Sequence, residues 1–329
     1  MVVGIVVCLI LVPLVYQSMN CYIEDTRFPK VTPRLDELKS YTHSPSRSSL
    51  PATDVIVILT TSVHRELILR LMLFDEKFAD NFTTPLMIVH SGLPTQSSLK
   101  RLTHFIQRPI IFLRIDRIFE MFPANFDPCR TKATWSTRGK WNYQLMIRFW
   151  TKIVFELPQL QQYDYMMRLD DDSQIMNKWL NVFDEMRRTH AVYFANDVVI
   201  EEERVLPGTL KLKPVTFEYQ KMKNIKVKQA EMLRQAFTDE YVLSYANNFE
   251  VMRLDFFRRS DVRQWIEMID QTHGIFKYRW GDAVIRYLTI ALFTEEHEVL
   301  HRSQYNLSYC HRKCGLPTSL KLKLKQYVQ

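Results

Sequence analysis

The fold of this chain is most constrained by short, β-branched apolar runs that alternate with amphipathic segments. The run DVIVILTT at residues 54–61 has no polar alternation, which is typical of a strand buried on both faces. After it, apolar residues recur at helical spacing and predict a helix over residues 64–80. Similar patterns predict strands at 86–90, 110–115, 163–169 and 191–195, and a helix at 141–157. Strands separated by helices predict an α/β fold with a mostly parallel central sheet and helices on both faces, which binds its ligands outside the carboxyl ends of the strands.

A scarcity of glycine limits how the chain could hold a nucleotide. Only 7 of the 329 residues are glycine. A dinucleotide-binding fingerprint needs glycines two and three residues apart, and a P-loop needs two glycines five residues apart before a lysine. Neither motif can be written from these positions. A bound diphosphate would therefore be held by something other than a glycine-rich loop.

The net charge favours an acidic partner but not nucleic acid. Lysine and arginine exceed aspartate and glutamate by 8, a surplus that suits a phosphorylated substrate or an anionic membrane. The basic residues are spread along the chain, and no RNP, zinc-finger or basic-zipper pattern occurs. We therefore expect no nucleic-acid partner.

The first 52 residues differ in composition from the rest. Residues 1–16 carry no charge, no basic segment precedes them and no A-x-A-like cleavage site follows. This pattern predicts an uncleaved signal-anchor over 1–19; a buried strand or helix is the alternative. Residues 20–52 are rich in proline and serine and predict a stem, followed by a single catalytic domain over 53–329. The charges that flank the apolar segment leave its orientation open, because basic and acidic residues both follow it.

Sequons and cysteines bear on the compartment. Asn81 and Asn306 each begin an N-x-S/T triplet, which gives modest support for a lumenal location. Cysteines 21, 129, 310 and 314 could form one or two disulfides in an oxidising lumen. The spacing of Cys310 and Cys314 around His311 leaves structural zinc as the alternative.

Three consecutive carboxylates, Asp170-Asp171-Asp172, follow directly on the predicted strand at 163–169. Adjacent carboxylates repel one another, and a cation among them lowers that cost. Mg²⁺ and Mn²⁺ take oxygen ligands and share them with substrate phosphates, and Asp170 and Asp172 could converge on one ion. The alternative is a solvated acidic loop.

Three further groups of residues could carry chemistry. Glu250 follows a β-like run at 241–245, where a surface glutamate is the simpler interpretation. Asp282, after Trp280-Gly281, could act in a site or could cap a helix that runs to residue 293. Histidines near the end of the chain, at 297, 301 and 311, could add a ligand to the aspartates.

Five segments together resemble one family. The segment HGIFKYRWGDA at 273–283 is similar to the family's GGFxYERWGDAP, and YQLMIRF at 143–149 is similar to YRHMCRF. YDYMMRLDDD at 163–172 resembles YDWYWRVEPD, NFEV at 248–251 resembles NFEI, and SYCH at 308–311 resembles GYxH. They occur in the family's order and cover roughly residues 54–314. The family is that of the fungal Golgi α-1,2-mannosyltransferases, glycosyltransferase family 15.

The resemblance implies a Rossmann-like fold of the GT-A type, GDP-mannose as nucleotide-sugar donor, a glycan or glycoprotein acceptor and Mn²⁺ as cofactor. It also implies a single-pass type II protein of the Golgi or endoplasmic reticulum membrane, with the catalytic domain in the lumen. By position, Asp170 and His311 match the family's metal-binding glutamate and histidine. Asp172 matches the last acid of the motif, and we expect it to bind substrate.

The remaining site residues are also carried over from the family by position. Tyr143 and Arg168 match residues that contact donor or acceptor. Glu250 matches the acid assigned to the anomeric carbon, and Asp282 matches an active-site aspartate. The family retains the anomeric configuration. Two glycines, Gly274 and Gly281, lie inside the best match, so their substitution is expected to harm activity more than change at residues 92 or 208.

Departures from the family pattern keep two rival functions open. The acidic motif is Asp-Asp-Asp instead of Glu-Pro-Asp, and the proline and histidine after WGDA are replaced by Val284 and Ile285-Arg286. Two family cysteines are absent, with Ile147 in place of one. These changes would suit a catalytically inactive lumenal glycan-binding relative, whereas the aspartates alone would suit a metal-dependent nucleotidyltransferase or phosphotransferase.

Overall fold

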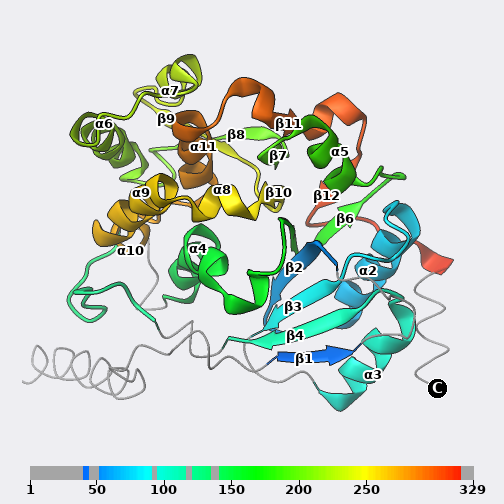
Figure 1. Ribbon diagram of the computed structural model, residues 1–329. Coiled ribbons are helices and arrows are strands. Elements are labelled where there is room, and N and C mark those ends of the chain that lie inside the picture. The colour runs from blue at the N-terminus through cyan, green and yellow to red at the C-terminus, as the bar shows by residue number, and fades with distance from the viewer. Residues whose placement is uncertain (1–39, 44–51, 91–94, 116–120, 135–140, 320–329) are drawn as a thin grey trace, which may run out of the picture.

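An eight-stranded mixed sheet forms the centre of the computed structural model (Figure 1). The structure describes residues 40–43, 52–90, 95–115, 121–134 and 141–319. Across the sheet the strand order is β1-β4-β3-β2-β5-β10-β7-β11. In chain order the strands are β1 (Ser40–His43), β2 (Asp54–Thr60), β3 (Leu86–His90), β4 (Ile110–Arg114), β5 (Tyr165–Asp170), β7 (Tyr193–Ala195), β10 (Phe249–Arg253) and β11 (Val299–His301).

The pairing of β2, β3, β4 and β5 is parallel, whereas β10 pairs antiparallel with both β5 and β7. Two small antiparallel sheets lie beside the main one. They are formed by β6 (Ser173–Ile175) with β12 (Tyr309–His311), and by β8 (Val198–Glu202) with β9 (Tyr241–Tyr245).

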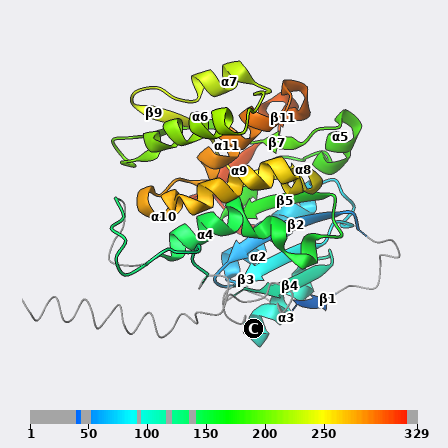
Figure 2. The same cartoon turned by 60° about the vertical axis from the view of Figure 1, so that its left-hand side comes forward.

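Helices cover both faces of the main sheet, because alternate side chains of its buried strands enter two separate cores. In β2, Val55 and Val57 belong to one core, and Ile56 and Ile58 belong to the other. Helices α2 (Arg65–Lys77), α3 (Gln96–Phe105) and α5 (Val182–Thr189) pack into the second core. The first core takes α4 (Asn142–Thr151), α8 (Leu254–Arg258), α9 (Ser260–Gln271), α10 (Gly274–Tyr278) and α11 (Asp282–Phe293), as Figures 1 and 2 show. Helices α6 (Leu212–Met222) and α7 (Ala230–Gln235) lie beyond α11 (Figure 1). The predicted α/β class is confirmed.

Two predicted elements differ in detail. The helix expected over 141–157 ends as α4 at Thr151 and continues in two short 3₁₀ turns, Ile153–Glu156 and Pro158–Leu160. Proline disfavours a helical conformation in the residue before it, and Leu157 is extended, with ψ of 122°. Glu250 was expected after a strand but lies inside β10, because a turn at 247–248 separates β9 from β10.

Strand β1 lies within the segment expected to be a stem and pairs antiparallel with the edge strand β4. The rest of the expected stem, apart from Ala52, and the whole expected signal-anchor lie outside the described residues. Among the residues that the structure describes, no helix combines the length and the apolar character that crossing a membrane requires.

Candidate active site

The two predicted metal ligands, Asp170 and His311, come together with Asp172 at the carboxyl end of β5. Asp170 is the last residue of β5, and Asp172 lies in the turn that leads to β6. The Nε2 atom of His311 is 2.9 Å from an Oδ1 of Asp172 and 3.8 Å from an Oδ2 of Asp170. One ligand atom from each of the three residues lies within 4.8 Å of the others. The central aspartate, Asp171, points elsewhere and accepts a hydrogen bond from the Thr60 hydroxyl at 2.7 Å.

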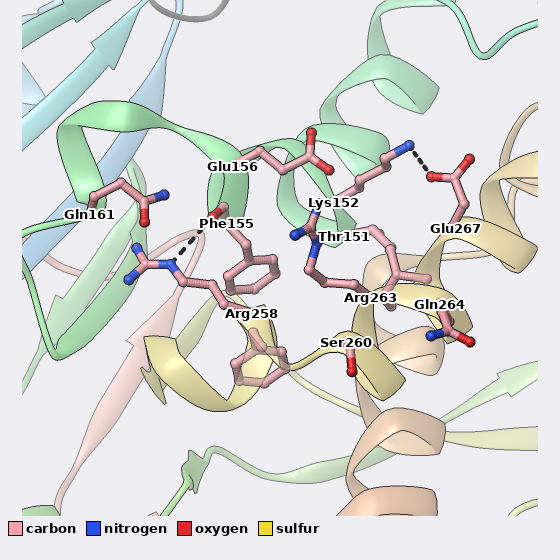
Figure 3. Close-up of a pocket in the computed structure, with 12 residues that line it drawn as sticks. Thr151, Lys152, Phe155, Glu156, Gln161, Arg258, Ser260, Arg263, Gln264 and Glu267 are labelled. Atoms are coloured by element: carbon pink, nitrogen blue, oxygen red, sulfur yellow. Dashed lines mark hydrogen bonds and ion pairs between the residues drawn. The ribbon is translucent and has the colours of Figure 1, made fainter.

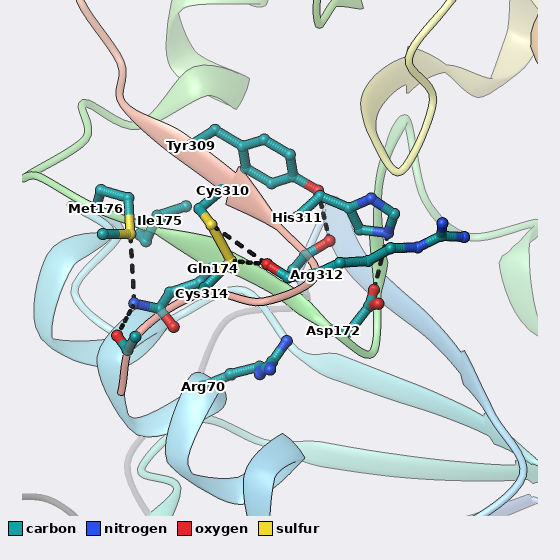
Figure 4. Close-up of a disulfide and its surroundings, with 12 residues drawn as sticks. Arg70, Asp172, Gln174, Ile175, Met176, Tyr309, Cys310, His311, Arg312 and Cys314 are labelled. Atoms are coloured by element: carbon teal, nitrogen blue, oxygen red, sulfur yellow. Dashed lines mark hydrogen bonds and ion pairs between the residues drawn. A yellow bond between two sulfur atoms is a disulfide. The ribbon is translucent and has the colours of Figure 1, made fainter. Parts of the chain in front are cut away.

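Strand pairing brings His311 to the aspartates from the far end of the chain. In the β6–β12 ladder His311 is the partner of Ser173, the residue after Asp172. The hydroxyl of Tyr309, two residues earlier on the same strand, lies 2.5 Å from that of Ser173. A disulfide between Cys310 and Cys314 closes the loop that follows His311 (Figure 4). The alternative of structural zinc is therefore wrong, because both thiols are consumed in the disulfide; Cys129 is disulfide-bonded as well.

This trio is chemically suited to a divalent cation. Two carboxylates and one imidazole form a mixed oxygen and nitrogen set that accommodates Mn²⁺. Burial raises the pKa of Asp170, while the neighbouring Arg168 opposes that shift. The acidic group is thus partly enclosed by the protein, unlike the solvated loop that was the alternative.

Arg168 connects the trio to the other predicted acids. This arginine is buried on β5, and its guanidinium donates to Oδ1 of Asp170 at 3.1 and 3.2 Å and to Oδ2 of Asp282. Its Nη1 is 3.5 Å from Oε1 of Glu250, and its Cζ lies 4.3 Å from the ring centre of Trp150. Burial alone lowers the pKa of an arginine, but the three carboxylates raise the pKa of Arg168 well above its usual value. Arg168 is therefore a fixed positive charge beside the trio.

Glu250 is fully buried, and one of its two carboxylate oxygens is hydrogen-bonded. Its Oε2 accepts hydrogen bonds from the Tyr193 hydroxyl at 2.8 Å and from Nε of Arg286 at 2.9 Å. Its Oε1 accepts none from the described residues. Arg286 stands where the family has a histidine. This departure from the family pattern gives the Glu250 carboxylate a second guanidinium beside that of Arg168. The interpretation of Glu250 as a surface residue is wrong, because its exposed fraction is 0%.

Asp282 starts α11 but does not cap it. Gly281 occupies the cap position, and no side chain accepts a hydrogen bond from the first turn. The Asp282 carboxylate instead accepts from Arg168 and from the Asn247 amide, the latter at 2.7 Å. The helix-cap alternative is thus excluded, and Asp282 belongs to the same ionic cluster as Glu250.

At the outer edge of this cluster, Tyr143 is the most exposed of the predicted residues. Its exposed fraction is 41%, and its hydroxyl accepts from Nη2 of Arg279 at 2.8 Å. The Arg279 guanidinium also lies over the Tyr143 ring, 4.7 Å from its centre. Burial raises the pKa of Tyr143, and nearby Asp282 and Glu201 reinforce that shift.

Glu201 is a site residue that the sequence analysis missed. It lies on β8, and burial raises its pKa to about 7. Arg279 opposes this shift and Asp282 adds to it. The only sequence signal is an acidic run, Glu201 to Glu203, directly after three apolar residues. Such a run reads as solvated surface until the fold shows that one of its members faces Asp282.

The glycines of the site are only partly as expected. A methyl group on Gly274 would lie 2.1 Å from the Trp280 ring, which supports the expected sensitivity. A methyl group on Gly281 would meet only the carboxylate end of the flexible Glu201 side chain, 3.0 Å from its Oε1. Gly208, expected to be less sensitive than Gly274 and Gly281, has φ of +100° and would place a methyl group 2.6 Å from the Tyr278 ring. On steric grounds Gly208 is therefore less tolerant than Gly281, the expected order of activity loss stays a prediction, and residue 92 lies outside the described residues.

Other candidates lie away from this cluster. His297 and His301, unlike His311, are not part of the metal-ligand group found among the described residues. A cavity of about 550 Å³ opens between the 3₁₀ turn at Ile153–Glu156 and helices α8 and α9 (Figure 3). It contains none of the predicted site residues. Its basic Lys152 is already paired, with Glu267 at 2.5 Å and Asp270 at 3.1 Å.

Comparison of the sequence with known protein families shows to which family the chain belongs. Residues 29–323 match the family described as "Glycolipid 2-alpha-mannosyltransferase". The chain belongs to this family. The match covers the sheet and all seven predicted site residues, which confirms the resemblance seen in the five sequence segments.

Curated relatives of this mannosyltransferase family match over part of their length. The chain is 28% identical to "Probable mannosyltransferase KTR3" of Saccharomyces cerevisiae over 163 residues, which are 48% of this chain and 39% of that protein. It is 26% identical to "Alpha-1,2 mannosyltransferase KTR1" of the same yeast over 193 residues, 56% of this chain and 48% of that protein. These matches span less than half the length of either relative.

Solved structures of the family share the fold over most of this chain. Core-mannan synthase A (CmsA/Ktr4) of Aspergillus fumigatus, in a Mn/GDP form, gives a TM-score of 0.68 at 18% identity and covers 84% of this chain and 82% of that one. Ktr4p of S. cerevisiae in complex with GDP gives 0.64 at 19% identity, covering 91% and 81%. The predicted GT-A type fold is thereby confirmed.

Proposed function

We propose that this chain is a retaining glycosyltransferase that moves mannose from GDP-mannose to a glycan hydroxyl, with α-1,2 linkage and Mn²⁺ assistance. The observation that carries the proposal is the joining of Asp170, Asp172 and His311 at the end of β5, with Arg168 beside them. Family membership and solved relatives in GDP-bound and Mn/GDP forms support the donor and the metal.

Asp170, Asp172 and His311 would hold the cation. A bound divalent cation neutralises the charge of a diphosphate leaving group as the glycosidic bond breaks. His311 presents Nε2 toward both aspartates, and the β6–β12 ladder fixes the position of its backbone. Arg168 keeps a permanent positive charge within reach of the same group.

Glu250 is proposed as the acid that stabilises positive charge at the anomeric carbon. Its Oε2 is anchored by Tyr193 and Arg286, and no residue in the described part of the chain donates a hydrogen bond to Oε1. An ionised carboxylate stabilises an oxocarbenium-like transition state or traps it covalently. Since Glu250 is fully buried, its contact with a sugar needs a shift of the side chains that cover it.

Asp282 and Tyr143 are proposed to orient the sugars. Asp282 binds Arg168 and the Asn247 amide with one oxygen, Oδ2, so its position is fixed on two sides. Tyr143 presents an exposed ring and a hydroxyl at the edge of the cluster. Both arrangements suit hydrogen bonding and stacking with a neutral polyhydroxyl ligand.

We further propose the domain arrangement and location expected from the sequence, namely a signal-anchor, a stem and a lumenal catalytic domain of the Golgi or endoplasmic reticulum. Both sequon asparagines, Asn81 and Asn306, are exposed, and the Cys310–Cys314 disulfide suits an oxidising compartment. Glycosidase-sensitive mass on the full chain isolated from cell membranes would test the lumenal location.

The proposal is tested by incubating the full chain with a panel of nucleotide sugars, with Mn²⁺ and with chelator. We expect mannose to be released from GDP-mannose, only with the metal, and with His311→Ala nearly inactive. Intact metal binding without cleavage of any nucleotide sugar would favour the glycan-binding relative. Transfer of a nucleotidyl or phosphoryl group in place of the sugar would favour the phosphotransferase.

A further inference from the structure

The cavity of about 550 Å³ beside α8 and α9 lies outside the proposed active site (Figure 3). Its volume falls in the range of small-molecule sites, about 300–1,000 Å³. Phe155 and Phe257 line it, and their ring centres lie 5.1 and 4.5 Å from Cζ of Arg286. Arg286 in turn donates to Glu250 at 2.9 Å. The two rings and Arg286 therefore separate the cavity from the active-site cluster.

Two arginines that line this cavity have no carboxylate partner within the described ranges. There Arg258, the last residue of α8, donates only to main-chain carbonyl groups, those of Phe155 at 3.4 Å and Leu160 at 2.8 Å. The side chain of Arg263, on α9, forms no hydrogen bond or ion pair with any described residue. Burial lowers the pKa of Arg258, because Asp255 offsets only part of the loss of hydration. An anionic ligand would compensate such a desolvated guanidinium.

The other charged groups that line the cavity leave this positive surplus in place. Lys152 and Glu267 form an ion pair at 2.5 Å and so neutralise each other. Burial raises the pKa of Glu156, against the opposing effects of Lys152 and Arg263. A raised pKa favours the protonated carboxyl group, which can donate a hydrogen bond to an oxyanion. Two unpaired guanidiniums therefore stand against a single unpaired acid.

Two neutral residues of the cavity also suit an oxyanion. Ser260 is the first residue of α9, and in the described part of the chain no side-chain hydrogen bond caps this helix. The N–H groups and the dipole at a helix N-terminus favour an anion. The Oγ1 of Thr151 is buried and has no hydrogen-bond partner among the described residues. Buried polar atoms are nearly always hydrogen-bonded, so this hydroxyl is an exception that a bound ligand would resolve.

We propose that this cavity is a second ligand site, which binds a phosphate group through Arg258 and Arg263. Guanidinium groups bind phosphate oxygens with pairs of parallel hydrogen bonds. A phosphate monoester carries a charge of about −1.5 to −2 at pH 7, which matches two guanidiniums better than the single charge of a carboxylate does. The ligand is inorganic phosphate or a phosphate monoester, and its binding does not depend on the proposed glycosyl transfer.

The test is calorimetric titration of inorganic phosphate, and separately of glucose 6-phosphate, into the full chain in the presence of chelator. The chelator keeps metal ions away from Asp170, so that metal-assisted binding in the active site does not contribute. Arg263→Gln removes one guanidinium from the cavity. Arg259→Gln removes an exposed arginine that does not line the cavity, at the same junction of α8 and α9, and is the matched control.

We expect Arg263→Gln to raise the Kd of the bound probe about tenfold, because a hydrogen bond between charged groups is lost. Arg259→Gln should keep the Kd of the wild type, and both variants should keep its melting temperature. Binding of glucose 6-phosphate would identify the ligand as a phosphate monoester, and binding of phosphate alone would identify it as inorganic phosphate. Absence of binding of both probes to the wild type, an equal Kd in Arg263→Gln, or equally tight binding of uncharged glucose would overturn the proposal.

Discussion

Glu250→Gln tests the buried ionic cluster formed by Arg168, Glu250, Asp282 and Arg286. The substitution removes the negative charge that lies between Arg168 and Arg286, at 3.5 and 2.9 Å. Removing one partner of a buried ion pair costs about 3–5 kcal/mol of unfolding free energy, because the other charge stays buried. For a domain of this size, each kcal/mol lowers the melting temperature by roughly 2 °C, so a fall of roughly 6–10 °C is expected.

The same variant separates stability from catalysis. At a temperature where Glu250→Gln remains folded, we expect transfer from GDP-mannose to be abolished while GDP binds with nearly unchanged affinity. The assay pairs thermal unfolding with mannose release and GDP calorimetry. Glu240→Gln, an exposed change outside the cluster, is the control. Normal turnover by Glu250→Gln, or a melting temperature equal to that of the control, would refute the reasoning.

Three further changes have defined outcomes. Gly274→Ala forces a methyl group against the Trp280 ring at 2.1 Å, so urea unfolding should show a loss of about 1–3 kcal/mol; no loss would mean that the ring moves freely. Replacing Cys310 and Cys314 together by serine removes a five-residue loop closure worth about 2 kcal/mol and should also weaken Mn²⁺ binding through the loop after His311; unchanged Mn²⁺ affinity would contradict this. Burial raises the pKa of Glu201 from 4.5 to about 7 in the folded state. Between these two pH values folding therefore takes up a proton, and the free energy of unfolding falls as pH rises. Glu201→Gln should therefore be more stable than the wild type above pH 7, by at most about 3 kcal/mol, and equal stability at pH 8 would count against the shift.

The sequence predicts the elements of the fold better than the contacts of the site. The apolar run of β2 and the aspartates after β5 identify the sheet and its binding edge from local pattern alone. His311 could be placed beside Asp170 only through the family resemblance, because the β6–β12 ladder joins residues far apart in the chain. Local pattern carries no information about such a pairing.

Two residues show why the rest could not be predicted. Arg286 reads as a polar position on α11, yet it is fully enclosed and binds Glu250, which lies on a strand 36 residues earlier. Glu201 reads as one of three equivalent acids, and only the fold shows that its carboxyl lies near Asp282. In both cases the function of the side chain depends on tertiary neighbours, whereas periodicity reports only which face of an element is apolar.

The central claim is that Asp170, Asp172 and His311 bind the metal that holds a nucleoside diphosphate. Titration of Mn²⁺ into the full chain, followed by electron paramagnetic resonance with and without GDP, measures this directly. The account predicts one Mn²⁺ site whose affinity rises when GDP is present, and loss of that site in His311→Ala with the fold intact. Equal Mn²⁺ affinity in the wild type and in His311→Ala, with or without GDP, would contradict it.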